Sequence, residues 1–461
     1  MPTGSQSAEH TAPSLELAQF VSSLSYEDLP PDAVHLAERC FVDTVGVGIA
    51  GATAAAGEVA AETIAAAYGS GPASLFGRTG SAPVAEAAFV NGTAAHALDY
   101  DDVSNGMDGH PSTTMVGPII AAAEAYDATG RELLTAYVAG FETQCYIARP
   151  NLRDRTGVGL HPVGWHPTAI FGTFGATAAV ANLLGLTVQE THQALNIAAS
   201  KPSGIKRNFG SLMKPMHAGQ SGAAGVRAAL LAAHGGEATQ DAIEHGFYPV
   251  YADVDELDLE VLPALGDDWS ILEDGVDIKL YPSCYATHTA IHATATLADE
   301  HRIDPDDVER IHLDVNGMME DLLVYDDPET EAQAKFSIPW AVAAAVTFDY
   351  IGIETFEPAT LQTPAAQVVR ERVTYERDPD LVYGTREMTV TIETTDDEAY
   401  TLTEDQPPAT HHNPLSDAKL REKFIECATR TLDREAAEAA YERLDTLRDQ
   451  EDVAAVVEHL S

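Results

Sequence analysis

The sequence predicts a mainly α-helical protein, with a large all-helical domain built from both chain ends and a smaller inserted α+β domain. Residues 14–246 are rich in Ala and Leu at helical spacing, whereas strand-like alternation of apolar and polar residues is concentrated after about Gly275. Residues 415–461 return to a charged helical pattern, so we expect the C-terminal helices to rejoin the first lobe. The predicted domain limits are 1–274, 275–407 and 408–461.

The helices of the first lobe are expected from apolar residues at spacings of three and four, bounded by Pro or Gly. Pro13 precedes a short amphipathic helix, and Pro31 opens a longer one that ends near Gly51. Gly185 and Gly235 are natural helix ends. The other predicted helices are Glu58–Ala67, Val84–Leu98, Met115–Tyr126, Glu132–Ile147, Thr168–Leu184, Val188–Ala199 and Ala218–His234.

Three strands are expected in the inserted segment. Val308–Val315, Glu387–Glu393 and Tyr400–Leu402 alternate apolar and polar residues, which is typical of strands with one buried face. Residues 394–398 (TTDDE) separate the last two and predict a hairpin turn. A loop with two consecutive prolines, 405–413, then leads to the C-terminal helices.

The charge balance argues against two classes of partner. The 461 residues include 26 Lys and Arg against 72 Asp and Glu, a net charge of −46. Such a surface repels phosphate backbones and anionic lipid, so we expect neither nucleic acid nor a membrane as partner. Only seven lysines occur, and none precedes Lys201. A carboxylate-rich, lysine-poor surface favours a halophilic protein, because concentrated salt screens the repulsion between carboxylates.

Compartment and cysteine chemistry follow from what the sequence lacks. The four cysteines are too few and too widely spaced for a disulfide framework or a zinc knuckle. No apolar run approaches the roughly 20 residues that span a bilayer. Met1–Pro13 lack the basic and apolar stretches of a signal peptide. We therefore expect a cytoplasmic protein.

The segment Asn91–Asp102 (NGTAAHALDYDD) is the first candidate for chemistry. His96 and Asp99 lie three residues apart near a predicted helix end, and His110 follows in the loop GHPSTT. Histidines and carboxylates in a loop on a rigid scaffold are typical of acid/base sites. The alternative is that His96 packs inside while the aspartates cap a helix or face water.

One further segment carries a candidate histidine, and another carries the first three lysines of the chain. His166 precedes Pro167 in GWHPTA at a predicted helix start, where the helix N-terminus favours an anion; the alternative is a histidine that only packs. Lys201–His217 (KPSGIKRNFGSLMKPMH) holds three of the seven lysines and is the basic island of an anionic chain. An anionic ligand needs such a local field, so Lys206 and Lys214 are candidate substrate-binding residues.

Lys279 opens KLYPSCYATHTAIH at the predicted domain transition, and clefts between lobes are favoured ligand sites. Cys284 has no evident thiolate-stabilising partner, which favours a small core residue over a nucleophile. His288 and His292 have the spacing of a metal pair on a helix, but the sequence singles out no third ligand. We therefore predict no metal site.

These segments together resemble the MmgE/PrpD family, which includes 2-methylcitrate dehydratase, cis-aconitate decarboxylase and iminodisuccinate epimerase. The resemblance covers nearly the whole chain, in order and with similar spacing. The matching stretches are DTVGVGIAG from Asp43, FVNGTAAHALDYDD from Phe89, GHPS from Gly109, GWHPTAIFGTFGATAAVANLLGL from Gly164, MKPMHAGQSGAAG from Met213, KLYPSC from Lys279, AKFSIPWAVAAA from Ala334 and HNPLSDAKLREKF from His412.

The resemblance implies a helical domain from both chain ends, a smaller α+β lid, a homodimer, and an active site between the domains without metal or organic cofactor. Carried over residue by residue, the family's site positions fall on Asp99, His110, His166, Lys214 and Lys279.

Three positions depart from the cis-aconitate decarboxylase pattern that the resemblance implies. Val103 stands where that enzyme has a threonine, and Cys284 stands where it has a lid histidine. Tyr325 is only near, in sequence, to the tyrosine that the decarboxylase lid contributes. These departures argue against itaconate production, and Val103 also weakens the assignment to 2-methylcitrate dehydratase.

The chemistry of the candidate residues agrees with the family on reaction class. Protons beside a carboxylate are weakly acidic, so their removal needs a positioned base and cations that hold the developing charge. Lys214 and Lys279 suit carboxylate binding, His110 or His166 can move the proton, and Asp99 can act as base or orient a histidine. We expect a cofactor-independent lyase that dehydrates a small tricarboxylate such as 2-methylcitrate. The alternatives are an isomerase, epimerase or decarboxylase on the same fold, and a non-catalytic helical binding protein.

Overall fold

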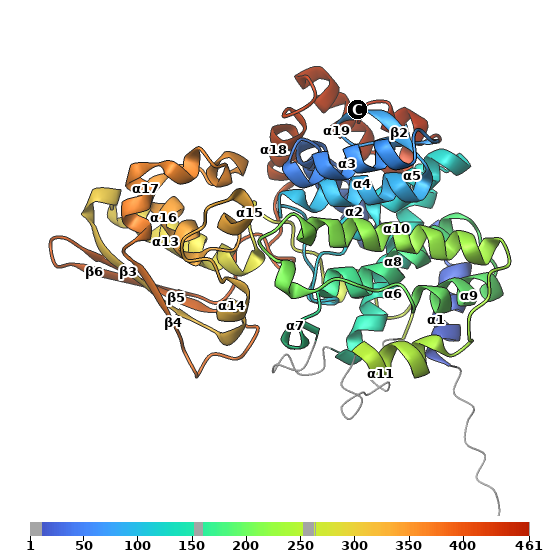
Figure 1. The fold of residues 1–461 in the computed structure, drawn as a ribbon, viewed down its shortest axis with the longest axis horizontal. Coiled ribbons are helices and arrows are strands. Elements are labelled where there is room, and N and C mark those ends of the chain that lie inside the picture. Colours follow the sequence, from blue (N-terminus) through green and yellow to red (C-terminus); the bar gives the residue numbers. More distant parts are fainter. Residues whose placement is uncertain (1–11, 152–159, 252–261, 263, 461) are drawn as a thin grey trace, which may run out of the picture.

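The computed structural model describes residues 12–151, 160–251, 262 and 264–460, and it is mainly helical (Figure 1). The segment on which the signal-peptide prediction rests, Met1–Pro13, lies almost wholly outside these residues. In Figure 1 a sheet with its helices lies on one side and a larger group of helices on the other. Residues 284–404 are called the lid below, and the remaining described residues are called the body.

The body helices that the sequence predicts are present, within a few residues at most ends, whereas three short ones at Leu160–Val163, Tyr248–Tyr251 and Ser270–Glu273 were not predicted. α10 is the exception, because it begins five residues before the predicted Ala218 and takes Pro215 into its first turn, where a missing N–H costs nothing. The body helices are α1 (Pro13–Ser23), α2 (Pro31–Gly51), α3 (Ala55–Ala67), α4 (Val84–Ala97), α5 (Val116–Tyr126), α6 (Gly130–Ala148), α7 (Leu160–Val163), α8 (Pro167–Leu183), α9 (Val188–Ala198), α10 (Met213–Ala233), α11 (Tyr248–Tyr251), α12 (Ser270–Glu273), α18 (Asp417–Ala428), α19 (Arg434–Asp445) and α20 (Ala454–Val457).

A small hairpin in the body was not predicted. β1 (Ala73–Leu75) pairs antiparallel with β2 (Arg78–Ala82). Both strands are too short for an alternation to show in the sequence. Side chains outside the hairpin hold it, since Glu124 accepts hydrogen bonds from the Ser74 backbone N–H and hydroxyl, and Asn91 bonds the Phe76 and Ser74 backbone.

Glycines bring α4 and α10 together. A Cβ on Gly92 would lie 3.0 Å from the Gly219 Cα, and a Cβ on Gly219 would lie 2.2 Å from the Phe89 carbonyl oxygen. No side chain fits between the two helix backbones at this crossing. The loop that follows α4 therefore comes close to the start of α10, the two segments that carry Asp99 and Lys214.

The lid contains a four-stranded sheet in the order β4-β3-β5-β6. β3 (Val308–Val315) pairs parallel with β4 (Val373–Arg377) and antiparallel with β5 (Met388–Thr394), which pairs antiparallel with β6 (Ala399–Glu404). Alternate residues of β5 are buried in one apolar core with α13 and α16. The lid helices are α13 (His288–His301), α14 (Gly317–Leu322), α15 (Glu331–Ala334), α16 (Ile338–Thr347) and α17 (Pro364–Arg370).

The three predicted lid strands are present, and so is the predicted turn. The Thr394 N–H donates to the Glu398 carbonyl oxygen at 2.9 Å, and Asp397 has a φ of 66°, which Asp tolerates better than most residues. β4 was missed because this edge strand is mostly exposed, so its sequence VTYER has no clear apolar face.

The C-terminal helix α18 packs against α2. Arg39 of α2 pairs with Asp417, and the Lys423 ammonium lies 2.6 Å from an Asp43 carboxylate oxygen. Val276 and Ile278 belong to the same apolar core as these body helices. The domain limits 1–274, 275–407 and 408–461 stay a prediction.

Among the residues that the structure describes, no single helix has both the length and the apolar character of a membrane span. α2 and α3 meet these criteria only as a pair, and the chain bends by 80° between them.

Candidate active site

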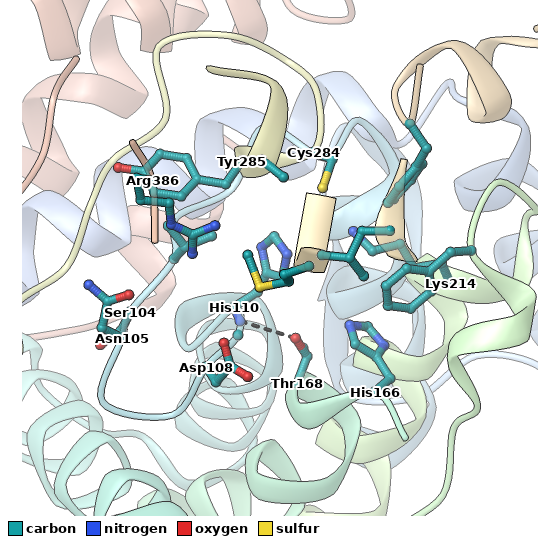
Figure 2. A pocket seen from close by; sticks show the side chains of 17 residues that line it. Ser104, Asn105, Asp108, His110, His166, Thr168, Lys214, Cys284, Tyr285 and Arg386 are labelled. Carbon is teal, nitrogen blue, oxygen red and sulfur yellow. Dashed lines mark hydrogen bonds between the residues drawn. The ribbon is translucent and has the colours of Figure 1, made fainter. Parts of the chain in front are cut away.

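A pocket with about 580 Å³ of empty space, part of it open to solvent, lies between the body and the lid (Figure 2). The body contributes Val103, Ser104, Asn105, Asp108, Gly109, His110, His166, Thr168, Phe209 and Lys214. The lid contributes Cys284, Tyr285, Ala286, Met318, Leu322, Phe336 and Arg386.

Asp99 lies behind the pocket and joins two lysines from distant parts of the chain. It follows the end of α4 with a φ of 51°, a left-handed conformation that Asp adopts more readily than most residues. One carboxylate oxygen accepts from Lys279 at 2.5 Å and the other accepts from Lys214. Burial raises the pKa of Asp99, but the charges of Lys214 and Lys279 outweigh it and hold the pKa well below its usual value.

Lys279 is fully buried and makes three hydrogen bonds with its three N–H groups. Besides the Asp99 carboxylate, its ammonium donates to the Asp99 carbonyl oxygen at 2.8 Å and to the Ser283 carbonyl oxygen at 3.0 Å. An ammonium group has no donor beyond three. Lys279 therefore positions Asp99, and it is not among the residues that line the pocket.

His110 is held from one side of its ring. Its Nδ1 lies 3.1 Å from an Asp101 carboxylate oxygen and 3.0 Å from the Asp102 carbonyl oxygen. Both neighbours are acceptors, so Nδ1 carries the proton and Nε2 keeps its lone pair. Burial lowers the pKa of His110 to about 3, against the opposing charge of Asp101, so the ring is neutral at pH 7.

The loop that carries His110 reaches α8 because Gly109 has no side chain. A Cβ on Gly109 would lie 2.8 Å from the Thr168 hydroxyl oxygen and 2.9 Å from the Met107 sulfur. The His110 backbone N–H donates to the Thr168 hydroxyl at 3.1 Å (Figure 2). This bond fixes His110 beside the first turn of α8, next to His166.

His166 is the residue before α8, as the sequence predicts. Its Nδ1 lies 3.2 Å from Nδ1 of His217. A hydrogen bond between two ring nitrogens contains one proton, so one of the two nitrogens donates and the other accepts. Burial, followed by the charge of Lys214, lowers the pKa of His166 well below its usual value. His166 and Lys214 both line the pocket, and the Lys214 ammonium also lies 5.0 Å from the centre of the Phe336 ring.

Asp101 and Asp102 are buried parts of the network rather than helix caps or solvent-facing acids. Asp101 also accepts from Nδ1 of His96 at 2.9 Å. Burial raises the pKa of Asp102 to about 7, although Ser112 donates to this carboxylate. The alternative that His96 packs inside while the aspartates cap a helix or face water holds only for His96, because Asp101 and Asp102 are buried and paired as well.

A second cavity, with about 1,200 Å³ of empty space, lies on the other side of the Asp99 carboxylate. Lys214 and Phe336 line both cavities. The second cavity is lined by many small and apolar residues, together with His96, Asp99 and Lys335, and it lacks His110 and His166. The first pocket is therefore the one that combines Lys214 with His110 and His166.

The structure brings four of the six predicted site residues into contact and places the other two apart from them. Asp99, Lys214 and Lys279 form one ion cluster, and His110 Nε2 lies 3.9 Å from Asp99. His166 also lines the pocket, but its ring contacts His217 rather than the ion cluster. Lys206 does not line the pocket; it lies in a short turn before α10, where its backbone N–H donates to the Gly164 carbonyl oxygen at 2.8 Å.

Several functional candidates escaped the sequence prediction. Asp101 lies inside the motif already singled out, but only the fold shows that it serves both His96 and His110. His217 lies three residues after Lys214 on α10, a spacing that puts both on one face. Arg386 follows no pattern that distinguishes it from other arginines.

Two sets of residues have the geometry to hold a metal ion among the described parts of the chain. His96, Asp101 and His110 are buried, but Asp101 already accepts from both rings and two ammonium groups nearby oppose a further cation. The second set, His312, Asp314 and Glu376, lies on the lid sheet, away from the pocket. His288 and His292, which have the spacing of a metal pair on a helix, belong to neither set.

Two family models match the chain in succession. The model described as the MmgE/PrpD N-terminal domain matches residues 15–260, and the model described as the MmgE/PrpD C-terminal domain matches residues 281–448.

Individual proteins are similar over most of the chain. Human cis-aconitate decarboxylase is 26% identical over 450 residues, which cover 94% of this chain and 92% of that protein. Cis-aconitate decarboxylase of Mus musculus is 26% identical, with 94% and 90% covered. Cis-aconitate decarboxylase of Aspergillus terreus is 25% identical over 309 residues, with 63% and 62% covered.

Proposed function

The chain belongs to the MmgE/PrpD family, and we propose that it is a cofactor-independent lyase that removes a proton beside a carboxylate of a small tricarboxylate. One observation carries the proposal: two neutral imidazoles and an ammonium group line one pocket of a chain whose net charge is −46. An anionic substrate needs this local cation against the overall field. The proposed roles below follow from the contacts of each residue.

His110 is the proposed base. Its Nδ1 proton is held by Asp101 and the Asp102 carbonyl, which leaves the Nε2 lone pair for a substrate proton. The low pKa of the free imidazole, about 3, makes it a weak base until an anionic substrate is bound. The carboxylates of a tricarboxylate stabilise the imidazolium and raise this pKa in the complex.

Lys214 is the proposed holder of negative charge. It lines the pocket and pairs with Asp99, whose other carboxylate oxygen accepts a hydrogen bond from Lys279. Charge that develops on the substrate carboxylate during proton removal is stabilised by such a preorganised ammonium. Asp99 stays ionised between two lysines, so its proposed role is to position Lys214 rather than to act as base.

His166 is the proposed acid for dehydration. His110 takes the C–H proton, the electron pair forms the C=C bond, the C–O bond breaks, and the hydroxide leaves as water with a proton from His166. A neutral imidazole is too weak an acid for this step, so His166 takes up a proton when the anionic substrate raises its pKa. Its Nδ1–H then donates to His217, and its Nε2 gives the proton to the leaving hydroxide. The products are an alkene and water.

Dehydration of a tricarboxylate such as 2-methylcitrate is the first candidate. Two observations support it over decarboxylation. The lid histidine of the decarboxylase pattern is replaced by Cys284, which lines the pocket. Tyr325 donates its hydroxyl proton to the Phe209 carbonyl oxygen at 2.9 Å and is not among the lining residues. Decarboxylation of cis-aconitate is the second candidate, favoured by the names of the similar proteins.

The test is an assay of the purified protein in concentrated KCl with 2-methylcitrate, followed by ultraviolet absorbance of the alkene. A parallel assay with cis-aconitate measures released CO₂. Alkene formation that His110→Asn abolishes supports dehydration. CO₂ release without alkene formation replaces it with decarboxylation, and no reaction of either substrate withdraws both.

We also propose the oligomeric state of the enzyme, its compartment and its salt requirement. The family resemblance supports a homodimer with a helical domain and a lid, and the charge balance supports work in a salt-rich cytoplasm. Light scattering after size exclusion in KCl tests the dimer. Thermal unfolding at increasing KCl tests the salt requirement, since screening reduces carboxylate repulsion and should raise the melting temperature.

A further inference from the structure

Arg386 is a cation at the pocket that the proposed reaction does not use. It lies in the loop between β4 and β5 and lines the pocket beside Tyr285. Among the described residues no ion pair joins it to a carboxylate, although the chain contains 72 Asp and Glu. An arginine left unpaired in so acidic a chain is available for an anion from solution.

The Tyr285 ring gives this guanidinium a fixed surface. The central carbon of the Arg386 guanidinium lies 5.1 Å from the centre of the ring, a distance typical of a cation–π contact. The Tyr285 hydroxyl donates to Asp277 at 2.9 Å, and the other oxygen of Asp277 accepts from His411. Asp277 is therefore engaged elsewhere, and the ring orients Arg386 without neutralising it.

Arg386 and Lys214 lie on opposite sides of His110 in the close-up view (Figure 2). Lys214 is a point charge beside the two imidazoles, where the proposed reaction occurs. Arg386 offers parallel N–H donors that match the two oxygens of a carboxylate. A substrate held at both ends presents the carbon between its carboxylates to Nε2 of His110.

We propose that Arg386, supported by Tyr285, forms a second carboxylate subsite that binds the substrate carboxylate remote from the reacting carbon. The inference rests on the proposed function and assigns Arg386 to a second carboxylate of that substrate, separated from the one beside the reacting carbon.

The test measures binding of tricarballylate, a saturated tricarboxylate without a hydroxyl group, by calorimetry at one fixed KCl concentration. Arg386→Gln should weaken binding about tenfold or more, since a hydrogen-bonded charge pair is lost. Arg386→Lys keeps the charge without the fork and should recover part of the affinity. The matched control, Arg377→Gln, removes the same charge from the exposed end of β4 and should stay within about twofold of wild type.

The outcomes separate the two proposals. Equal affinity of wild type and Arg386→Gln overturns the subsite and leaves the proposed function standing. Absence of binding to the wild-type protein withdraws both. If Arg386→Gln does not fold, Arg386→Lys carries the comparison, and wild-type affinity in that variant together with an unchanged KM for the substrate overturns the inference.

Discussion

The two walls of the pocket differ in how their polar groups are held. On the body wall, His110, His166 and Lys214 each have a buried partner: Asp101, His217 and Asp99. The lid wall consists of Cys284, Tyr285, Ala286, Met318, Leu322 and Phe336 with one cation, Arg386. The body wall is thus a preorganised network suited to proton transfer, and the lid wall is a surface suited to substrate selection.

This difference has a physical basis in the fold. Glycines hold the body wall in place: α4 and α10 meet at Gly92 and Gly219, and Gly109 lets the loop that carries His110 lie against Thr168. The lid wall takes Met318 and Leu322 from α14 and Arg386 from the loop between β4 and β5. Substitutions on the body wall should therefore reduce stability and turnover, whereas those on the lid wall should change mainly affinity and product.

The largest effect is expected for Lys279→Met. The change leaves the Asp99 and Ser283 carbonyl oxygens and one Asp99 carboxylate oxygen without their donor in a buried site. Breaking a buried pair from one side costs about 3–5 kcal/mol of the free energy of unfolding. Turnover should be lost as well. Urea unfolding and a steady-state assay measure the two quantities.

The matched control is Lys419→Met, which removes an exposed lysine paired with Glu422. Its free energy of unfolding should change by less than about 0.5 kcal/mol. Equal stability of the two variants would mean that Lys279 does not hold the body wall together.

His110→Asn should reduce kcat by about 10²–10⁴, the usual contribution of a positioned base. The asparagine amide can still donate to Asp101, so the fold should persist and far-ultraviolet circular dichroism should match wild type. A variant with wild-type kcat would move the base to His166.

Lower pH should destabilise the body wall. Burial lowers the pKa of His110 to about 3 and that of His217 to about 4. In the unfolded chain both rings have the ordinary pKa of about 6.5, so below that pH they bind protons that the folded chain does not bind. The free energy of unfolding then falls as the pH is lowered from 7 to 5. Asp102, with a pKa of about 7, acts in the opposite direction, because it holds its proton only in the folded state.

His110→Asn provides the internal comparison for this pH effect. The variant lacks one of the groups that gain a proton on unfolding, so its loss of stability between pH 7 and pH 5 should be smaller than that of wild type. Denaturant midpoints at both pH values in the same KCl concentration measure the difference. Parallel pH profiles would exclude His110 as a buried neutral imidazole.

The smallest effect is expected on the lid wall, for Cys284→Ala. Burial, with a further contribution from Asp99, raises the pKa of the thiol, so little thiolate forms near pH 7. The variant should keep kcat within about threefold of wild type. A loss comparable to that of His110→Asn would make Cys284 a nucleophile and remove the distinction between the walls.

Local rules predicted most of the helices and the motif that carries Asp99 and His110. Pro167 and the glycine-bounded apolar runs fix helix ends through short-range sterics, which a sequence displays directly. β4 escaped because an exposed edge strand owes its conformation to pairing with β3, a partner far away in sequence.

The roles of individual cations depend on tertiary geometry. Lys206 and Lys214 belong to one basic segment, yet only Lys214 enters the pocket, because α10 begins at Met213 and turns it inward. Lys279 was expected to contact substrate, but its three hydrogen bonds point it at Asp99 and Ser283 instead. Neither result can be obtained from residue type and spacing alone.

The central claim is that the body wall transfers a proton at a carbon beside a carboxylate. Proton NMR of 2-methylcitrate and cis-aconitate incubated with the protein in D₂O tests it directly, because dehydration removes a C–H bond, epimerisation exchanges one, and decarboxylation places deuterium on carbon. We predict such a change for at least one of the two acids with wild type and none with His110→Asn. Unchanged carbon-bound protons in both acids, with a folded and salt-stable protein, would contradict the account.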